Sequence, residues 1–218
     1  MKRRAFLQTA GVGSTLALAA STHAADGDGG AKGGPEGQTT VFEFLGRSDQ
    51  DGPQVTHYGY ITHVFGLEDE LLFSDPNVRT EATARLTFLA VTLLDSRHVH
   101  GNLISTSAPG EMTTFFNQHP QGDFNAPDSF ARGRPIASYA TRYHNVLNVQ
   151  TPNQGIANAT AELTQLKATS FELGPQRVRF GRPKMRLRLV ATGQGTRTQA
   201  DPLNAFFLLG GGAFVIEA

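Results

Sequence analysis

Two histidines separated by one residue, His98 and His100, are the residues of this sequence whose types and spacing best fit a chemical site. Side chains at positions i and i+2 of a β-strand lie on the same face, so both imidazoles could reach one metal ion. A third ligand would have to come from elsewhere in the chain, from His144, His57, His63 or Glu111. The competing interpretation is that both histidines are solvated or hydrogen-bonded near a strand end. The sequence requires no cofactor, and a metal at His98 and His100 remains one alternative.

Other catalytic patterns are weaker. The sequence contains no cysteine, no Gly-x-Ser-x-Gly motif and no phosphate-binding loop. Glu43, Asp95 and Arg97 lie on or near expected strands and would suggest acid–base chemistry if they faced a cavity, because a buried charge is costly unless it is paired. Six basic residues between positions 177 and 188 could receive an anionic partner, or could form a solvated strand face that discourages edge pairing.

The elements that would carry these residues are predicted to be strands. From Thr40 onward apolar and polar residues alternate with a period of two, and valine, phenylalanine, tyrosine and threonine are frequent. We expect strands at 41–45, 55–65, 84–101, 103–116, 136–149, 156–173, 178–192, 205–209 and 213–217. Glycine and proline turns separate them, and no amphipathic helix is evident. About eight short strands predict an all-β fold, an antiparallel eight-stranded β-barrel, with a β-sandwich as the alternative.

Two strands indicate what the interior contains. Small residues at Ala157, Ala159 and Ala161 share one face of their strand, which predicts a small-residue inner wall. The middle of the 84–101 strand, from Leu86 to Leu93, is apolar on both faces, so it should lie between packed layers or contact another subunit. An eight-stranded barrel can enclose one small ligand.

The long irregular segment 117–135 is predicted to be a lid, because long connections in compact domains are usually binding loops, lids or disorder. Its aromatic side chains, and those just before it, should fold back onto apolar surface. We expect the ligand to be held in the barrel beneath this loop by six aromatic residues: Phe115, Phe116, Phe124, Phe130, Tyr58 and Tyr60.

The first 24 residues have the three regions of an export signal: the basic residues Lys2 to Arg4, an apolar run over 10–20 and the small-residue exit Thr22-His23-Ala24. The segment Arg3-Arg4-Ala5-Phe6-Leu7 resembles the twin-arginine (Tat) motif. That resemblance implies passage through the twin-arginine machinery in a folded state, cleavage after Ala24 and a periplasmic or extracellular location. A chain without cysteine fits folding in a reducing compartment before export.

Cleavage after Ala24 leaves 194 of the 218 residues, the size of a single domain. It also removes three of the 19 basic residues and no acidic one, which gives 16 basic against 19 acidic residues and a net charge of −3. This balance does not favour nucleic-acid binding, and no later apolar run is long enough for an integral membrane span. Residues 25–38 are rich in glycine and predict a flexible leader before a domain over 39–218.

The pattern of short strands, the alanine-lined face at Ala157 to Ala161 and the long loop at 117–135 resembles the allene oxide cyclase and dirigent group of small β-barrels. The resemblance covers roughly residues 40–218 and is architectural, so no site residue is carried over. It implies an apolar substrate held inside the barrel and assembly into a homo-oligomer.

We therefore expect an exported soluble β-barrel that binds a small apolar ligand. One alternative is a cofactor-free cyclase or isomerase, or a metal enzyme using His98 and His100. Another is a surface or interaction protein without a cavity function.

Overall fold

The computed structural model describes residues 40–217. The predicted signal peptide (1–24) and leader (25–38) lie outside the described residues. Within 40–217 no helix is long and apolar enough to cross a membrane.

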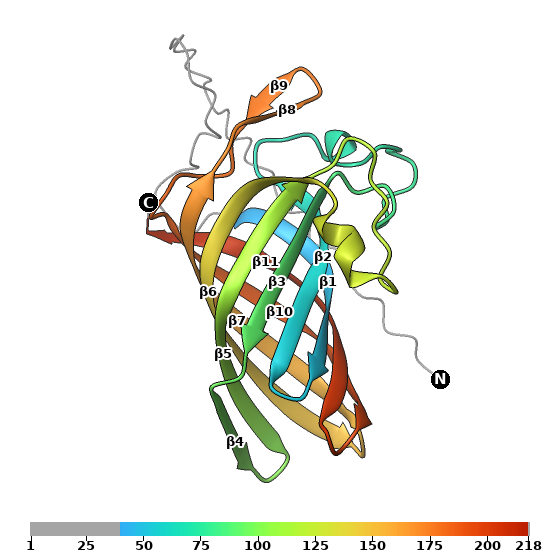
Figure 1. Cartoon of the computed structure of the whole chain (residues 1–218), viewed down its shortest axis with the longest axis vertical. Helices are drawn as coiled ribbons and strands as arrows, with labels where there is room; N and C mark the ends of the chain where they lie inside the picture. The colour runs from blue at the N-terminus through green and yellow to red at the C-terminus, as the bar shows by residue number, and fades with distance from the viewer. Residues whose placement is uncertain (1–39, 218) are drawn as a thin grey trace, which may run out of the picture.

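The described chain is almost entirely β-structure (Figure 1). Its first five strands are β1 (Thr40–Asp51), β2 (Gln54–Val64), β3 (Leu86–Leu93), β4 (Ser96–His100) and β5 (Leu103–Phe116). The remaining strands are β6 (Arg134–Thr151), β7 (Gln154–Ala168), β8 (Phe171–Leu173), β9 (Gln176–Val178), β10 (Arg186–Gln199) and β11 (Asn204–Glu217). Two short 3-10 helices, η1 (Asp69–Leu72) and η2 (Pro127–Ala131), lie in the connections before β3 and β6.

The sheet closes into an eight-stranded antiparallel barrel, which confirms the predicted fold class and excludes the sandwich. The strand order is β3-β2-β1-β11-β10-β7-β6-β5-β4, and β3 also pairs with β5. That closing pair runs from Leu86 opposite Phe116 to Thr92 opposite Gly110. The extra strand β4 pairs with the other end of β5, beyond the end of β3, so it extends the wall on one side.

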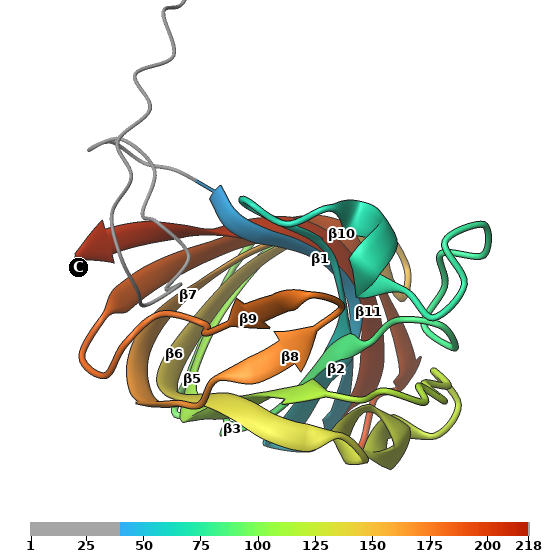
Figure 2. The same cartoon turned by 90° about the horizontal axis from the view of Figure 1, so that it is seen from above.

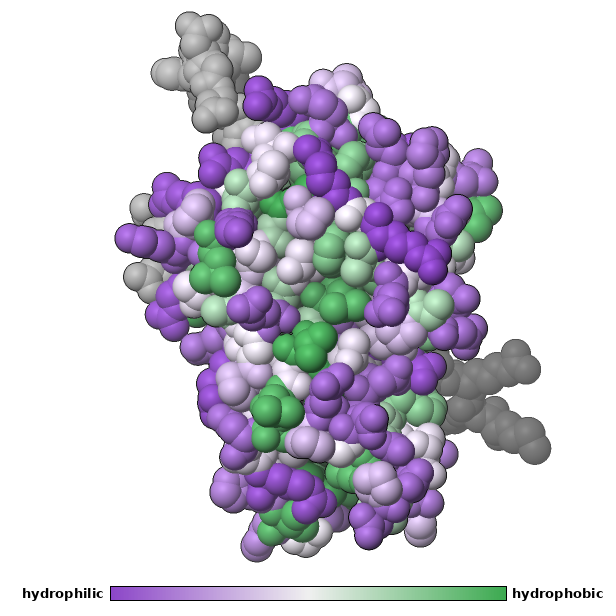
Figure 3. All heavy atoms as spheres, viewed as in Figure 1, coloured by the Kyte–Doolittle hydropathy of each residue, from purple (hydrophilic) through white to green (hydrophobic). Residues whose placement is uncertain are grey.

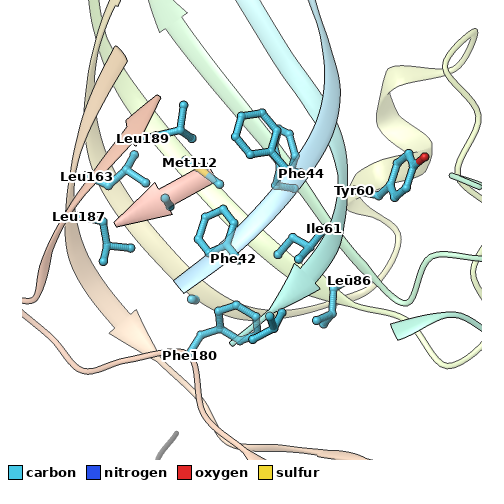
Figure 4. Packing of buried hydrophobic residues seen from close by; sticks show 14 of the residues in the cluster. Phe42, Phe44, Tyr60, Ile61, Leu86, Met112, Leu163, Phe180, Leu187 and Leu189 are labelled. Carbon is cyan, nitrogen blue, oxygen red and sulfur yellow. The ribbon is translucent and has the colours of Figure 1, made fainter. Parts of the chain in front are cut away.

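The predicted inner faces of two strands are correct. Ala157, Ala159 and Ala161 of β7 are buried inside the barrel, and β10 contributes Leu187 and Leu189 from the neighbouring strand. Figure 4 shows Leu163, Leu187 and Leu189 extending toward Phe42, Phe44 and Met112 across the interior. Small side chains on one wall therefore leave room for phenylalanines on the opposite wall.

Several predicted strand boundaries were wrong. The strand expected over 41–45 extends from Thr40 to Asp51, and the strand expected over 156–173 is divided at Thr169 and Ser170 into β7 and β8. The strand expected over 84–101 is divided at Leu94 and Asp95 into β3 and β4. The strand expected over 178–192 begins later, at Arg186, because Gly181 and Lys184 have positive φ values of 64° and 74° that interrupt extended backbone.

The two strands expected on either side of Gly210–Gly212 form one strand, β11. A side chain at Gly211 would overlap the Val190 carbonyl oxygen and lie 2.7 Å from the Ala191 Cα of β10. Glycine at this position therefore permits close strand pairing and does not form a turn.

The apolar outer face of β3 is covered over half its length by the 117–135 segment. The Thr87 hydroxyl donates a hydrogen bond of 2.6 Å to the Phe130 carbonyl, and η2 packs against β3. Further along the strand, Val91 and Leu93 are exposed. Figure 3 shows apolar side chains among polar ones down the middle of the face seen in Figure 1. A homo-oligomer formed through this surface stays a prediction.

A substitution at Gly59 tests how tightly the strands of the barrel wall are packed. It pairs with Gly46 on β1 and with Phe88 on β3. A Cβ at Gly59 would overlap the Leu45 carbonyl oxygen and lie 2.9 Å from Cζ of Phe88. We expect Gly59→Ala to lower the free energy of unfolding by about 2 kcal/mol, because backbone atoms cannot yield without separating the strands. Chemical denaturation measures this, with Thr160→Ala on the exposed face of β7 as the control. Equal stability of both variants would contradict the packing described.

Candidate functional site

One end of the barrel is closed by aromatic side chains. Figure 2 shows the β8–β9 hairpin lying across this end. Phe171 of β8 packs against Phe116 with ring centroids 4.9 Å apart, and against Phe180 at 6.1 Å. Phe180 in turn contacts Phe42 of β1 at 6.4 Å. A ligand therefore has no open path into the barrel through this stack.

The interior below this stack holds two cavities. The upper one, of about 50 Å³, lies between Phe44, Phe88, Met112 and the leucines of β7 and β10. The lower one, of about 140 Å³, extends toward the turns that join β1 to β2, β6 to β7 and β10 to β11. Ser48 and Tyr143 line both cavities, so they mark the boundary between them.

A buried hydrogen-bond chain lies at this boundary. Ser48 of β1 is 2.7 Å from Nδ1 of His57, and Nε2 of His57 is 3.0 Å from the Thr92 hydroxyl. The Thr92 hydroxyl donates to the Val55 carbonyl over 3.4 Å. Because each hydroxyl can either donate or accept, both tautomers of neutral His57 complete these two contacts. Both ring nitrogens of His57 therefore have hydrogen-bond partners within the barrel wall.

Burial keeps these groups uncharged. It lowers the pKa of His57 to about 4, because the charged imidazolium loses its hydration. Burial also raises the pKa of Tyr143, and a hydrogen bond with Ser48 opposes part of that rise. The Tyr143 ring lies 4.5 Å from the His57 ring. At neutral pH the boundary is therefore a neutral, hydrogen-bonded layer, and His57 is a poor base.

The lower cavity combines apolar walls with a few polar groups. Its apolar surface comes from Val55, Ile104, Leu147 and Phe207, which are contributed by four different strands. Its polar lining includes a buried amide on β6 and two arginines. No aspartate or glutamate is among its lining residues. The cavity therefore suits an apolar body and disfavours a cation.

Four of the six predicted ligand-binding aromatics come together, but on the outside of the barrel. Tyr58 lies with its ring centroid 5.3 Å from Phe130 and 6.0 Å from Phe124, and Tyr60 lies 6.3 Å from Phe124. Figure 4 shows Tyr60 directed away from the interior, toward the 117–135 segment. Strand alternation explains this, since the inner face of β2 carries Val55, His57 and Ile61. The 117–135 segment packs against the wall and is not a lid across the barrel.

The Tyr58 hydroxyl fixes this packing. It donates to Asp49 over 2.5 Å and lies 3.2 Å from the Phe124 carbonyl oxygen. Burial, and after it the hydrogen bond with the Asp49 carboxylate, raises the pKa of Tyr58. The remaining two aromatics, Phe115 and Phe116, are buried at the closed end of β5, and Phe116 belongs to the aromatic stack. None of the six lines either cavity.

The predicted metal pair, His98 and His100, lies on β4 with both side chains exposed. Among the described residues, no group of three or more histidine, aspartate, glutamate or cysteine side chains could hold a metal ion. The suggested third ligands have other partners or positions: His144 is 3.0 Å from the Ser105 hydroxyl, and His63 is 2.7 Å from Asp69.

Of the three acid–base candidates, Arg97 lines the lower cavity and is itself exposed, whereas Glu43 and Asp95 line neither of the two cavities described above. Glu43 is exposed, and Asp95 pairs with Arg142 at 2.9 Å. In the basic segment near β10, Arg186 and Arg188 both contact Glu162 of β7, at 3.3 and 2.8 Å. These two arginines therefore belong to exposed cross-strand ion pairs, which agrees with the interpretation of a solvated strand face.

The residues that sequence reasoning missed are Ser48, Tyr143, Asn145 and Arg197. A signal was available for His57, because it alternates with Val55, Gly59 and Ile61 on one face of β2. Asn145 likewise alternates with Tyr143 and Thr141. Alternation along a strand shows which side chains share a face, but it does not show which of the two faces points into the barrel.

Comparisons with known protein families, with curated proteins and with solved structures found no match to this chain. The candidate site is therefore argued from its own geometry.

The buried His57 predicts a pH dependence of stability. Its pKa is about 4 in the folded protein against 6.5 for an ordinary histidine, so the unfolded chain binds a proton more readily between these values. The contribution of neutral His57 to the free energy of unfolding is therefore fully present above pH 6.5. It is lost as the pH drops toward 4, by on the order of 3 kcal/mol. Denaturant midpoints of the protein and of His57→Gln, measured from pH 4 to 7, test this.

The His57→Gln variant should show a flatter pH profile than the unaltered protein. His119→Gln, in the exposed part of the 117–135 segment, should keep the original profile. If His57 had its ordinary pKa in the folded protein, the stability of all three proteins would depend on pH in the same way, and the account would be contradicted.

Proposed function

We propose that this protein binds a small apolar molecule non-covalently inside its barrel. The observation that carries the proposal is the hollow lower half of a closed sheet. Its interior is lined by Val55, Ile104, Leu147 and Phe207, and its other end is closed by the aromatic stack. A structural protein of this size would gain stability by filling that space, since interiors are normally close-packed.

The volumes limit the size of the ligand. A cavity of about 150 Å³ lined by apolar side chains binds benzene, and the lower cavity measures about 140 Å³. One ring therefore fits in it. The upper cavity, at about 50 Å³, has room for a small substituent, and Ser48 and Tyr143 stand between the two.

The cyclase or isomerase alternative is favoured by one observation. The Tyr143 phenol and the Ser48 hydroxyl lie at the boundary of both cavities, where they would touch a bound ring. Because burial raises the pKa of Tyr143, the phenol stays protonated and could donate a hydrogen bond to a bound molecule. The low pKa of His57 makes it a weak proton acceptor, so Tyr143 is the group we assign to that alternative.

The first prediction from this proposal concerns p-cresol, a neutral one-ring probe. We expect it to shift the backbone amide resonances of Gly155 and Gly195, which line the lower cavity, in a two-dimensional NMR titration. Ala205→Phe should weaken binding at least about tenfold, because the added ring occupies the cavity. Ala140→Phe places the same ring on the exposed outer face of β6 and should leave binding unchanged.

Both variants must first give the amide pattern of a folded barrel. Shifts confined to the cluster of Tyr58, Phe124 and Phe130, or equal binding by both variants, would contradict an interior site. A change in the structure of a natural ligand after incubation, abolished by Tyr143→Phe, would favour the enzyme alternative over simple binding.

We also propose that the protein is exported by the twin-arginine route and acts in the periplasm or outside the cell. The proposal is supported by the basic patch with Arg3 and Arg4, the short apolar run and the small-residue exit ending at Ala24.

The expected result is a mature protein whose mass lacks residues 1–24. Replacing Arg3 and Arg4 together by lysine should leave the full-length chain in the cytoplasm, because the paired arginines are the recognised feature. Lys2→Gln is the control and should still be exported. Intact-mass measurement of cell fractions checks this, and export of the double variant at the mature mass would contradict it.

A further inference from the structure

The buried hydrogen-bond chain extends to a side chain that borders both cavities. The Tyr143 hydroxyl hydrogen-bonds with Ser48, and Ser48 is 2.7 Å from His57 Nδ1. His57 Nε2 is 3.0 Å from the Thr92 hydroxyl, which is buried at the other end of the chain. Tyr143 is only partly buried and lines both cavities. Its remaining exposed surface therefore faces the interior space.

This chain carries one hydrogen more than it has links. Its four groups are Tyr143, Ser48, His57 and Thr92, and they are joined by three contacts. Each hydroxyl supplies one hydrogen, and so does a neutral imidazole. His57 is neutral because burial lowers its pKa to about 4. One hydrogen must therefore leave the chain at one of its two ends, and the tautomer of His57 determines which end.

The Thr92 end offers this hydrogen a poor acceptor. The Thr92 hydroxyl is 3.4 Å from the Val55 carbonyl oxygen, whereas hydrogen bonds between a hydroxyl and an oxygen are normally about 2.7–2.8 Å long. In the opposite arrangement Thr92 donates to His57 and His57 donates to Ser48. Ser48 then donates to the Tyr143 oxygen, which leaves the Tyr143 hydrogen free for an acceptor at the boundary of the two cavities.

A ligand with a neutral acceptor fits this chain better than one with only a donor. A donor to Tyr143 would keep the extra hydrogen on the long contact with Val55, whereas an acceptor gives it a bond of normal length, which contributes about 1 kcal/mol. An anionic acceptor would lose its hydration beside uncharged groups, which is costly. Apolar side chains supply most of the rest of the lining.

We propose that the ligand is a neutral one-ring carbonyl compound, such as an aromatic ketone, whose carbonyl oxygen accepts the Tyr143 hydrogen. Its ring lies in the lower cavity against Ile104, Leu147 and Phe207, and its small substituent enters the upper cavity. This inference rests on the proposed ligand-binding function and adds the chemical class of the ligand.

The test uses two probes of the same shape. Acetophenone carries a carbonyl group, and α-methylstyrene has a methylene group in place of the carbonyl oxygen. Affinities are measured by NMR titration of the folded proteins. We expect Tyr143→Phe to weaken binding of acetophenone about tenfold, because the hydrogen bond to the carbonyl is lost. Binding of α-methylstyrene should be unchanged, because it has no acceptor.

Tyr60→Phe is the matched control, because it removes the same hydroxyl from a side chain on the outside of the barrel. It should change neither affinity. A second measurement needs no variant: the infrared carbonyl stretch of bound acetophenone should lie at a lower frequency than in a hydrocarbon solvent, since a hydrogen bond weakens the C=O bond.

The possible failures are distinguishable. Equal effects of Tyr143→Phe on both probes, or a bound carbonyl stretch equal to that in hydrocarbon, would overturn the carbonyl class. Binding of p-cresol in the lower cavity without any binding of acetophenone would also overturn it and leave the proposed function standing. If acetophenone, α-methylstyrene and p-cresol all fail to bind, the proposed function itself fails.

Discussion

The pairing of β3 with β5 is the interaction on which the rest of the structure depends. It joins the two strands that would otherwise be the edges of an eight-stranded sheet, and it spans the length of β3 from Leu86 to Thr92. Once the sheet is closed, the inner side chains of all eight strands face one enclosed space. Without this pairing, Ser48, His57 and Asn145 would be polar residues on an open sheet face and not parts of an interior.

Closure also explains how the interior is divided. Phenylalanines fill the end covered by β8 and β9, a neutral layer of Ser48, His57 and Thr92 crosses the middle, and the other half stays hollow. The middle layer is fully hydrogen-bonded, so its polar atoms carry little cost. The half below this layer is hollow and lined mainly by apolar side chains, which is the physical reason to locate binding there.

Much of the fold could be predicted from the sequence. Alternation along β7 and β10 identified the inner faces, since alanine at 157, 159 and 161 and leucine at 187 and 189 follow a strict period of two. The boundaries were less predictable, because Gly210–Gly212 looks like a turn in the sequence and is a close strand contact in the structure. Local composition does not distinguish these two uses of glycine.

The site could be predicted less well. Tyr58, Tyr60, Phe124 and Phe130 do form a cluster, as their aromatic character suggests, but the direction of β2 places it outside. Ser48, Tyr143, Asn145 and Arg197 come from strands far apart in the sequence, and only barrel closure and register bring them together.

The most direct test of an interior site is a crystal structure of the protein with p-cresol bound. This account predicts electron density for the ring in the lower cavity, between Ile104, Leu147 and Phe207. Density only beside Tyr58 and Phe124 on the outer wall, or an interior filled by side chains with no ring inside, would contradict it.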